Sequence, residues 1–414
     1  MNSISARRLM IIACVVIPHF SALAFQNSDQ KVFDWPRFRG PEGNGISQES
    51  SLLKTWPADG PQQLWRMPLG IGYSGMSVQN NRLYTMDSDS SAESVLCLNA
   101  SSGELLWRQN IGPQYKNSYG DGPRATPTLE GDRLYALGAQ GKLLAANSET
   151  GELIWQVDLT ERFTFKPPQY WWGFSGSPFI DGDLLLVQAG GDGENTIAAF
   201  NKNTGALVWS RVAGFAAYTT PIAIDMHGKR QYIFVTAHEV ISLSADGNIN
   251  WRYDWGGWFI KIAMPVFVPP DKIFVSAAYD IGAVLLQIGA QGDTASVREV
   301  WKSRVMSNHF HSSVLLGDYL YGFDNGTLKC IEVETGTEKW GKRRLGKGSL
   351  IYADGMLIVL GERGQLVLVE ANPQQYVELA RHQALSGRSW TPPTLADGKL
   401  YLRNQTELLC LKMK

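Results

Sequence analysis

Short segments of alternating apolar and polar residues, rich in β-branched and aromatic side chains, repeat along the chain from about residue 64 to its end. Polar turns that contain Gly, Asp or Asn separate these segments. Alternation with a period of two, bounded by such turns, predicts short β-strands. We therefore expect an all-β fold.

Three kinds of segment recur in a fixed order. The first begins with a small residue or is marked by proline, and it occurs eight times: Ser74-Gly75, Thr126-Pro127, Ser177-Pro178, Thr220-Pro221, Met264-Pro265, Ser312-Ser313, Ser349-Leu350 and Thr391-Pro392. A tight polar turn then leads into an apolar pair, such as Leu83-Tyr84. The third segment alternates apolar residues around a small one, as in Leu144-Ala145-Ala146. The order repeats as a unit, which indicates a repeat architecture.

A fourth segment ends in Gly-x-x-x-Trp and closes most of the repeats. The pattern occurs at Gly103 to Trp107, Gly151 to Trp155, Gly205 to Trp209, Gly247 to Trp251 and Gly336 to Trp340, with looser members at Trp65 and Trp301. Four strands in each of eight units, about 44 residues long, predict an eight-bladed β-propeller of four-stranded antiparallel blades. A large flat ring at a fixed place in each repeat is expected to dock one blade on the next, so we assign these tryptophans a structural role.

The two ends of the repeat region are complementary. It opens on the tryptophan strand at Leu64-Trp65 and ends on a third strand over residues 408–411. We expect the N-terminal strand to complete the last blade and so to close the ring, which removes an exposed sheet edge.

The N-terminus differs in kind from the repeats. Arg7 and Arg8 precede an apolar run, and Ala22-Leu23-Ala24 has the small-x-small pattern of a signal peptidase site. We predict a signal peptide over residues 1–24, cleaved after Ala24, a leader segment over 25–63 and the propeller over 64–414. The alternative is a lipoprotein acylated at Cys14. Either reading predicts a periplasmic or secreted protein without a transmembrane segment.

The charge balance argues against nucleic acid as a partner, and the cysteine content argues against a fold held by disulfides. The chain has 38 basic and 39 acidic residues, so no long-range field favours nucleic acid. Cys97, Cys330 and Cys410 form no CxxC pair and stand in alternating apolar segments, where we expect them to fill the core. We expect a monomer.

Residues 144–155, Leu-Ala-Ala-Asn-Ser-Glu-Thr-Gly-Glu-Leu-Ile-Trp, resemble the tryptophan-docking repeat of the pyrroloquinoline quinone (PQQ) family, with Asn147 where that family usually has Asp. The segment from Trp35 to Pro41 is similar to the first segment of secreted bacterial PQQ-like propellers. The family contains quinoprotein dehydrogenases and the non-enzymatic BamB-type propeller of outer-membrane β-barrel assembly. The resemblance therefore implies a fold and leaves the function open.

In a propeller, the innermost strand of each blade lines the central channel, and the loops that lead into these strands, here called the lead-in loops, gather at one mouth. In this chain they hold four fixed cations, two histidines and several aromatic rings, and they contain no carboxylate. Converging cations flanked by rings suit a planar anionic ligand. The predicted ligand-binding residues are Arg124, Trp172, Lys261, His309, Lys347, Arg388 and Trp390.

The mouth has two other interpretations, a purely structural role of its side chains and a metal site. The same side chains could lean into solvent or hydrogen-bond the loop carbonyls of neighbouring blades. His309 and His311, two residues apart in an extended segment, would point to opposite faces, so we predict no metal site there.

Dehydrogenases of the PQQ family resemble one another in a Ca²⁺ ion held by Glu, Asn and Asp, in a catalytic Asp and usually in two adjacent cysteines. This chain has no adjacent cysteines. Carboxylates on the loops between second and third strands could take the missing roles: Asp192, Glu194, Asp280, Asp324 and Glu362. The alternative function is thus a dehydrogenase that uses PQQ and Ca²⁺ to oxidise alcohols or sugars.

The hypothesis that these observations favour is a non-enzymatic one. We expect an exported propeller that acts as a binding or scaffold protein in the cell envelope. Its partner would be another envelope protein or a small anionic ligand at the cationic mouth.

Overall fold

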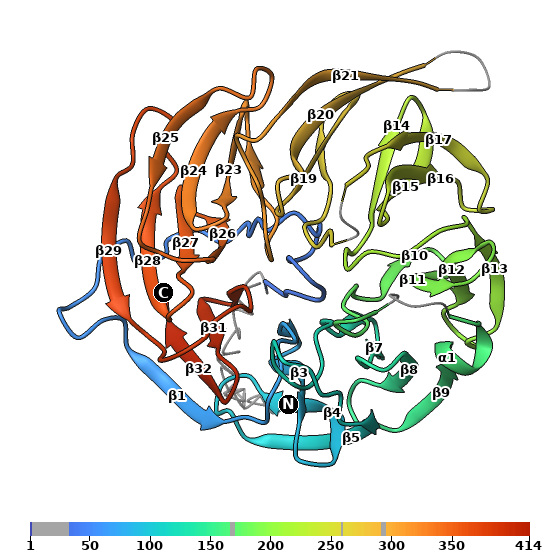
Figure 1. The fold of residues 1–414 in the computed structure, drawn as a ribbon. Coiled ribbons are helices and arrows are strands. Elements are labelled where there is room, and N and C mark those ends of the chain that lie inside the picture. The colour runs from blue at the N-terminus through green and yellow to red at the C-terminus, as the bar shows by residue number, and fades with distance from the viewer. Residues whose placement is uncertain (2–32, 166–169, 258–259, 291–294) are drawn as a thin grey trace. The chain divides into compact units, whose positions relative to one another are not determined.

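Eight four-stranded antiparallel sheets form a ring in the computed structural model (Figure 1), which confirms the predicted eight-bladed propeller. Blades 1 to 4 contain β2 (Ser77–Gln79), β3 (Arg82–Ser88), β4 (Ala92–Asn99) and β5 (Leu105–Pro113); β6 (Thr128–Glu130), β7 (Arg133–Leu137), β8 (Lys142–Asn147) and β9 (Leu153–Asp158); β10 (Phe179–Asp181), β11 (Leu184–Gly191), β12 (Asn195–Asn201) and β13 (Leu207–Arg211); and β14 (Ile222–Met226), β15 (Lys229–Val235), β16 (Glu239–Leu243) and β17 (Ile249–Asp254).

Blades 5 to 8 continue the order. They contain β18 (Val266–Val268), β19 (Lys272–Ala277), β20 (Gly282–Gly289) and β21 (Ser296–Ser303); β22 (Val314–Leu316), β23 (Tyr319–Asp324), β24 (Thr327–Glu332) and β25 (Glu338–Lys342); β26 (Ser349–Ala353), β27 (Met356–Leu360), β28 (Gln365–Glu370) and β29 (Glu378–Gln383); and β30 (Thr394–Ala396), β31 (Lys399–Arg403), β32 (Glu407–Lys412) and β1 (Gln63–Pro68). A one-turn helix, α1 (Leu159–Arg162), follows β9.

The structure describes residues 33–165, 170–257, 260–290 and 295–414, together with Met1. The predicted signal peptide, apart from its first residue, and Cys14 lie outside the described residues. The residues from Phe33 to Lys414 form one compact unit. In the part of the chain that the structure describes, no helix is long and apolar enough to cross a membrane.

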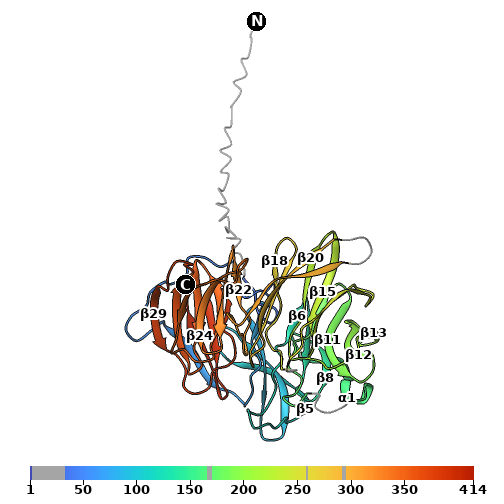
Figure 2. The same cartoon turned by 45° about the horizontal axis from the view of Figure 1, so that its top comes forward.

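The burial of the strands follows from the stacking of blades around the ring, which the inclined view in Figure 2 also shows. The middle strands β3 and β4 are buried along almost their whole length, because the adjacent blades cover both faces of the sheet there. The outer strand β5 alternates between exposed and partly buried residues. The position of a strand within its blade therefore explains both the apolar runs in the middle of each repeat and the alternating pattern at its end.

The ring is closed by strand β1, as predicted. It pairs antiparallel with β32, and Trp65 lies opposite Cys410. The first strand of the propeller and the last thus share a blade, so the ring has no open seam between its two ends.

The glycines of the Gly-x-x-x-Trp pattern lie against the tryptophan of the preceding blade. A Cβ atom added to Gly151 would fall 2.7 Å from Cδ2 of Trp107, so only glycine leaves room for the ring. The Nε1 of Trp107 also donates a hydrogen bond to the Ser148 carbonyl, at 3.1 Å. Gly103 with Trp65 and Gly205 with Trp155 repeat the ring contact.

The small residues that begin each repeat form a second set of contacts between blades. The backbone N–H of Thr126 donates to Oγ of Ser177 in the next blade at 3.0 Å, and the N–H of Ser177 donates to Oγ1 of Thr220 at 2.8 Å. The hydroxyl acceptors satisfy backbone donors that are buried near the channel. Ser and Thr recur at this position for that reason.

The described part of the predicted leader segment, residues 33–62 and here called the leader, begins inside the ring and ends at its outer edge beside β29 (Figure 1), where Nε1 of Trp56 donates to the Arg381 carbonyl. Trp35 forms a bridge with Val78 of blade 1. Arg39 is buried and donates to the carbonyls of Ser312 and Ser313, which precede the innermost strand of blade 6. Further on, Ser47 N–H donates to the carbonyl of Tyr352 in blade 7. The leader therefore contacts blades on several sides of the channel before it enters β1.

Candidate ligand-binding site

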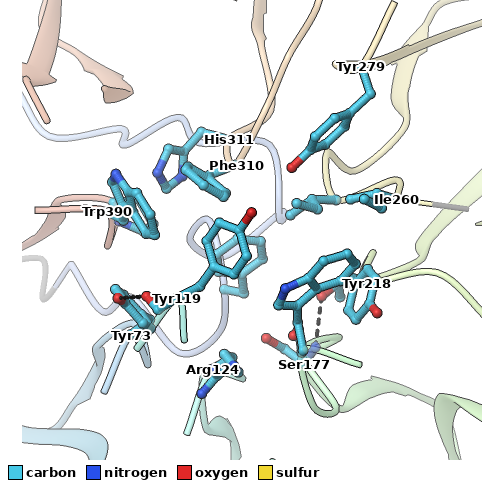
Figure 3. A pocket seen from close by; sticks show the side chains of 16 residues that line it. Tyr73, Tyr119, Arg124, Ser177, Tyr218, Ile260, Tyr279, Phe310, His311 and Trp390 are labelled. Atoms are coloured by element: carbon cyan, nitrogen blue, oxygen red, sulfur yellow. Dashed lines mark hydrogen bonds between the residues drawn. The ribbon is translucent and has the colours of Figure 1, made fainter. Parts of the chain in front are cut away.

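A cavity of about 160 Å³ opens at the mouth that the lead-in loops form. Half of its described lining residues are aromatic: Phe38, Tyr73, Tyr119, Trp172, Tyr218, Tyr279, Phe310 and Trp390. They come from the leader and from blades around the ring, and Figure 3 shows them gathered about one space. We call this space the aromatic cavity. Its position on the ring axis means that no single blade builds it.

The rings of the aromatic cavity hold one another in fixed orientations. Trp390 stacks on Tyr73 with 5.5 Å between ring centroids and lies 4.2 Å from Phe310. On another side, Trp172 meets Tyr218 edge to face at 5.7 Å. Such packed rings offer apolar surfaces that are already ordered, so a flat ligand would not have to order them.

Arg124 supplies the only fixed charge among the described residues that line the aromatic cavity. Its guanidinium donates to the carbonyls of Gly120, at 2.7 Å, and Gly122, and it lies 4.5 Å from the ring centroid of Tyr115. Burial lowers the pKa of Arg124 from its ordinary value. No carboxylate in the described chain forms a salt bridge with it, so part of its donor capacity remains for a ligand.

The leader contributes the floor of the aromatic cavity through Phe38. His311 lines the cavity beside it and is buried, and its Nε2 has no hydrogen-bond partner. Burial, with a smaller contribution from the positive charge of Arg39, lowers the pKa of His311 to about 3. His311 is therefore a neutral group at physiological pH.

Two of the seven predicted ligand-binding residues, besides Arg124, line the aromatic cavity, namely Trp172 and Trp390. Arg388 lies at its rim, where it is exposed, stacks 4.3 Å from the centroid of Trp390 and donates to the Tyr119 carbonyl at 2.8 Å. This arrangement matches the alternative in which mouth cations bind loop carbonyls.

The remaining three predicted residues, Lys261, His309 and Lys347, are not among the described residues that line the aromatic cavity. Lys261 is fully buried, donates to the carbonyl of Ala237 and has a pKa that burial lowers to about 8. Lys347 Nζ lies 3.1 Å from Nε2 of His309, whose pKa falls to about 4 through burial and the charge of Lys347. In the structure each ammonium is directed to a partner within the fold, Ala237 for Lys261 and His309 for Lys347.

Glu362 is the one carboxylate of the second-to-third strand loops that reaches this cluster. It accepts hydrogen bonds from Nε1 of Trp390, at 3.0 Å, and from the N–H of Lys347, at 3.1 Å. Burial opposes ionisation, but these hydrogen bonds together with the positive charges of Lys347 and Arg388 outweigh it and hold the pKa of Glu362 below its ordinary value. Glu362 therefore fixes the Trp390 ring. Within the described residues, no group of three or more His, Cys, Asp or Glu could hold a metal ion.

Several lining residues were not among those predicted. Tyr119 and Tyr279 stand on loops outside the repeated segments, and Phe38 belongs to the leader. A signal for Tyr119 was present, since it follows Tyr115 in a polar, Gly-rich stretch before the Thr126 start. Nothing in the sequence indicated that the leader would enter the channel.

The aromatic cavity fits PQQ poorly. PQQ is a tricarboxylate, and an unpaired buried carboxylate is costly. The described lining offers one guanidinium, that of Arg124, whereas Lys347 and Arg388 are not among the described lining residues. The flat rings would suit the cofactor, but the donor set does not match its charge.

The comparisons with known proteins agree with the fold. A family model described as outer membrane protein assembly factor BamB matches residues 53–160 and 91–342. The outer membrane protein assembly factor BamB of Yersinia pestis is 20% identical over 322 residues, which are 73% of this chain and 76% of that protein.

Two solved structures share the architecture. BamB from Moraxella catarrhalis has a TM-score of 0.58 at 16% identity, with 85% of this chain and 99% of that chain covered. The quinohemoprotein alcohol dehydrogenase from Comamonas testosteroni has a TM-score of 0.65 at 11% identity, with 92% and 80% covered. At these identities the structures establish the fold alone. The family model covers well over half of the chain, and the chain therefore belongs to the BamB-type family of PQQ-like β-propellers.

Proposed function

We propose that this chain is an exported binding or scaffold protein of the cell envelope and that the aromatic cavity is its site for a small anionic ligand. Membership of the BamB-type family supports the envelope role, because the named relatives are outer membrane protein assembly factors. We extend a role of that kind to this chain.

The observation that carries the ligand site is Arg124 among the rings. Its guanidinium is partly buried and forms no salt bridge with a described carboxylate, yet it lines a cavity whose other described lining residues carry no fixed charge. A bound anion would compensate the cost of burying that charge. The rings of Trp390, Phe310 and Trp172 would contact the flat body of the ligand.

The ligand site is tested by comparing Arg124→Gln with Arg388→Gln, a matched pair in which only the first arginine lines the cavity. The probes are 2-naphthoate and its uncharged analogue 2-naphthylmethanol, and their affinities are measured by calorimetry. We expect Arg124→Gln to weaken naphthoate about 10- to 100-fold, because a charge-assisted hydrogen bond is lost, and to leave naphthylmethanol unchanged. Equal losses in the two variants would show that the charge of the whole rim, and not Arg124, attracts the probe.

The envelope role is tested in cells. Export is measured by fractionation of the full chain and of a chain lacking residues 2–24, and cytoplasmic recovery of the full chain would contradict it. A photo-crosslinking side chain at Tyr119, exposed at the mouth, is compared with one at Leu153, exposed on the outer strand β9. Crosslinks to an envelope protein from Tyr119 would place the partner at the mouth, whereas crosslinks from Leu153 alone would place it on the blade edges.

The quinoprotein alternative is examined with the same purified protein. PQQ and Ca²⁺ are added, tryptophan fluorescence is followed, and alcohols and sugars are assayed with an artificial electron acceptor. We expect no turnover. Stoichiometric PQQ binding with turnover would replace the binding role by a dehydrogenase.

A further inference from the structure

Phe38 borders two cavities. The second, of about 240 Å³, lies toward the opposite end of the innermost strands, where β10 and β14 meet the leader, and we call it the polar cavity. Its described lining includes five charged residues: Arg37, Glu42, Glu130, Asp181 and Arg230. The two cavities have three lining residues in common, namely Phe38, Ser177 and Thr220.

Of these three shared residues, only Phe38 has a side chain that can fill the space between the cavities. Ser177 and Thr220 are small, and their hydroxyl oxygens accept backbone hydrogen bonds between blades from Thr126 and Ser177. They belong to the wall of the channel. The Phe38 ring, in contrast, comes from the leader, which runs inside that wall.

The leader is held on both sides of Phe38. Before it, the Pro36 carbonyl accepts from the N–H of Leu129 at 2.8 Å, and Trp35 bridges to Val78. After it, Arg39 is buried with a positive φ of 64° and donates to the Ser312 and Ser313 carbonyls at 2.8 Å. Anchors on opposite sides of the channel keep the Phe38 backbone from moving aside.

We propose that Phe38 is a partition that separates the aromatic cavity from the polar cavity and limits the length of the ligand that the aromatic cavity accepts. This inference rests on the proposed ligand site. It makes the leader part of the binding site, with Phe38 as a specificity-determining residue. Removal of the ring would join the two cavities into one longer space.

The proposal is tested with a short and a long rigid aromatic anion, 2-naphthoate and p-terphenyl-4-carboxylate, against the wild-type chain and Phe38→Ala. We expect Phe38→Ala to bind the long probe about 10-fold more tightly than the wild type does, because additional rings become buried. The short probe should lose affinity, roughly threefold, because it loses contact with the floor.

Phe310→Ala is the matched control, since Phe310 lines only the aromatic cavity and its removal takes away an equal ring. We expect it to weaken both probes. Phe38→Leu, a smaller change that protects the fold, should give part of the gain for the long probe. Equal binding of the long probe to the wild type and Phe38→Ala, or the same gain in Phe310→Ala, would overturn the partition.

A crystal structure of Phe38→Ala supplies a readout without any ligand. A single continuous cavity from the lead-in loops to the polar cavity supports the partition even if neither probe binds, in which case the proposed ligand site is what fails. A leader that shifts to refill the space of the ring overturns the partition, whatever the probes do.

Discussion

The two cavities of the ring differ in chemistry although they share Phe38, Ser177 and Thr220 in their linings. The aromatic cavity is lined mainly by rings and has one fixed charge among its described residues, that of Arg124. The lining of the polar cavity includes five charged side chains, and two of them form a pair in which Arg230 binds Asp181 through Nε and Nη2, at 2.9 and 2.8 Å. The polar cavity thus holds a hydrogen-bonded ion pair, whereas the one fixed charge in the described lining of the aromatic cavity has no carboxylate partner.

This difference follows from the connections at each end of the innermost strands. At the polar cavity, β6 and β10 pass through tight turns to their neighbours, so the turn geometry leaves few positions free to vary. At the aromatic cavity, lead-in loops such as residues 114–127 join one blade to the next and carry the side chains that meet on the axis. Long loops on a rigid scaffold are where binding residues concentrate, which favours the aromatic cavity as the functional one.

The leader lies between the two cavities, and of the changes considered, the removal of its buried anchor Arg39 should lower the stability most. Arg39→Ala would leave the carbonyls of Ser312, Ser313 and Asn44 without their donor. We expect it to lower the free energy of unfolding by about 3 kcal/mol or more. Denaturant unfolding measures the loss, and limited proteolysis should find the leader newly cleavable.

Arg37→Ala is the matched control, two residues away on the same segment. The Nε of Arg37 has no hydrogen-bond partner in the described chain, and its guanidinium lies over the Phe179 ring at 5.7 Å. The guanidinium forms no salt bridge with a described carboxylate, although those of Glu42, Glu130 and Asp181 attract it. We expect a loss below about 1 kcal/mol. Similar losses for the two arginines would mean that the leader is held by its charge as a whole and not by the Arg39 hydrogen bonds.

The repeat could be predicted from sequence because each of its marks has a local physical cause. Gly151 must lack a Cβ for the Trp107 ring to lie on it, and Ser177 must be a small hydroxyl residue to accept from Thr126. Both constraints act in successive blades, so the residues that satisfy them recur in the sequence at a regular spacing. Ring closure by Trp65 followed from the count of strands alone.

The site was harder to predict, because its residues come from different blades and from the leader, and the repeat pattern does not show which of them lie together. The sequence places Lys261 and Arg124 in equivalent lead-in loops, yet Lys261 is directed to the Ala237 carbonyl and Arg124 to the cavity. Which way a loop side chain turns depends on neighbours from other blades. Phe38 was missed for the same reason, since the path of the leader is set by distant partners such as Ser312.

A smaller effect on stability is expected from pH, and it arises at the aromatic cavity. His309 and His311, at the aromatic cavity, have pKa values of about 4 and 3, below the ordinary 6.5, chiefly because burial disfavours the charged form. The unfolded chain therefore binds protons that the folded chain does not between pH 6.5 and these values. Stability must fall as pH falls through that window, by about 1 kcal/mol for each histidine from pH 6.5 to 5.5.

The measurement is the unfolding free energy at pH 7.5, 6.5 and 5.5 for the wild type, His309→Gln and His311→Gln. Each variant should show a flatter pH profile than the wild type. His382, which stands on the outer strand β29 away from both cavities, gives the matched control His382→Gln. If its profile flattened as much as that of His311→Gln, titration elsewhere in the chain would account for the acid sensitivity.

The smallest effect is expected at the polar cavity, from Arg230→Gln. Its ion pair holds the pKa of Asp181 below the ordinary value, mainly through the Arg230 hydrogen bonds, so the pair adds stability above pH 4 that is lost as Asp181 becomes protonated. Arg230 is partly exposed, which limits the loss to about 1 kcal/mol, and added salt should reduce it. Arg388→Gln, at the rim of the aromatic cavity, should cost less than about 0.5 kcal/mol at any salt concentration, because that arginine has no carboxylate partner among the described residues. An equal, salt-sensitive loss in both variants would mean that paired charge stabilises both ends of the channel, and the contrast between the two cavities would then be one of shape alone.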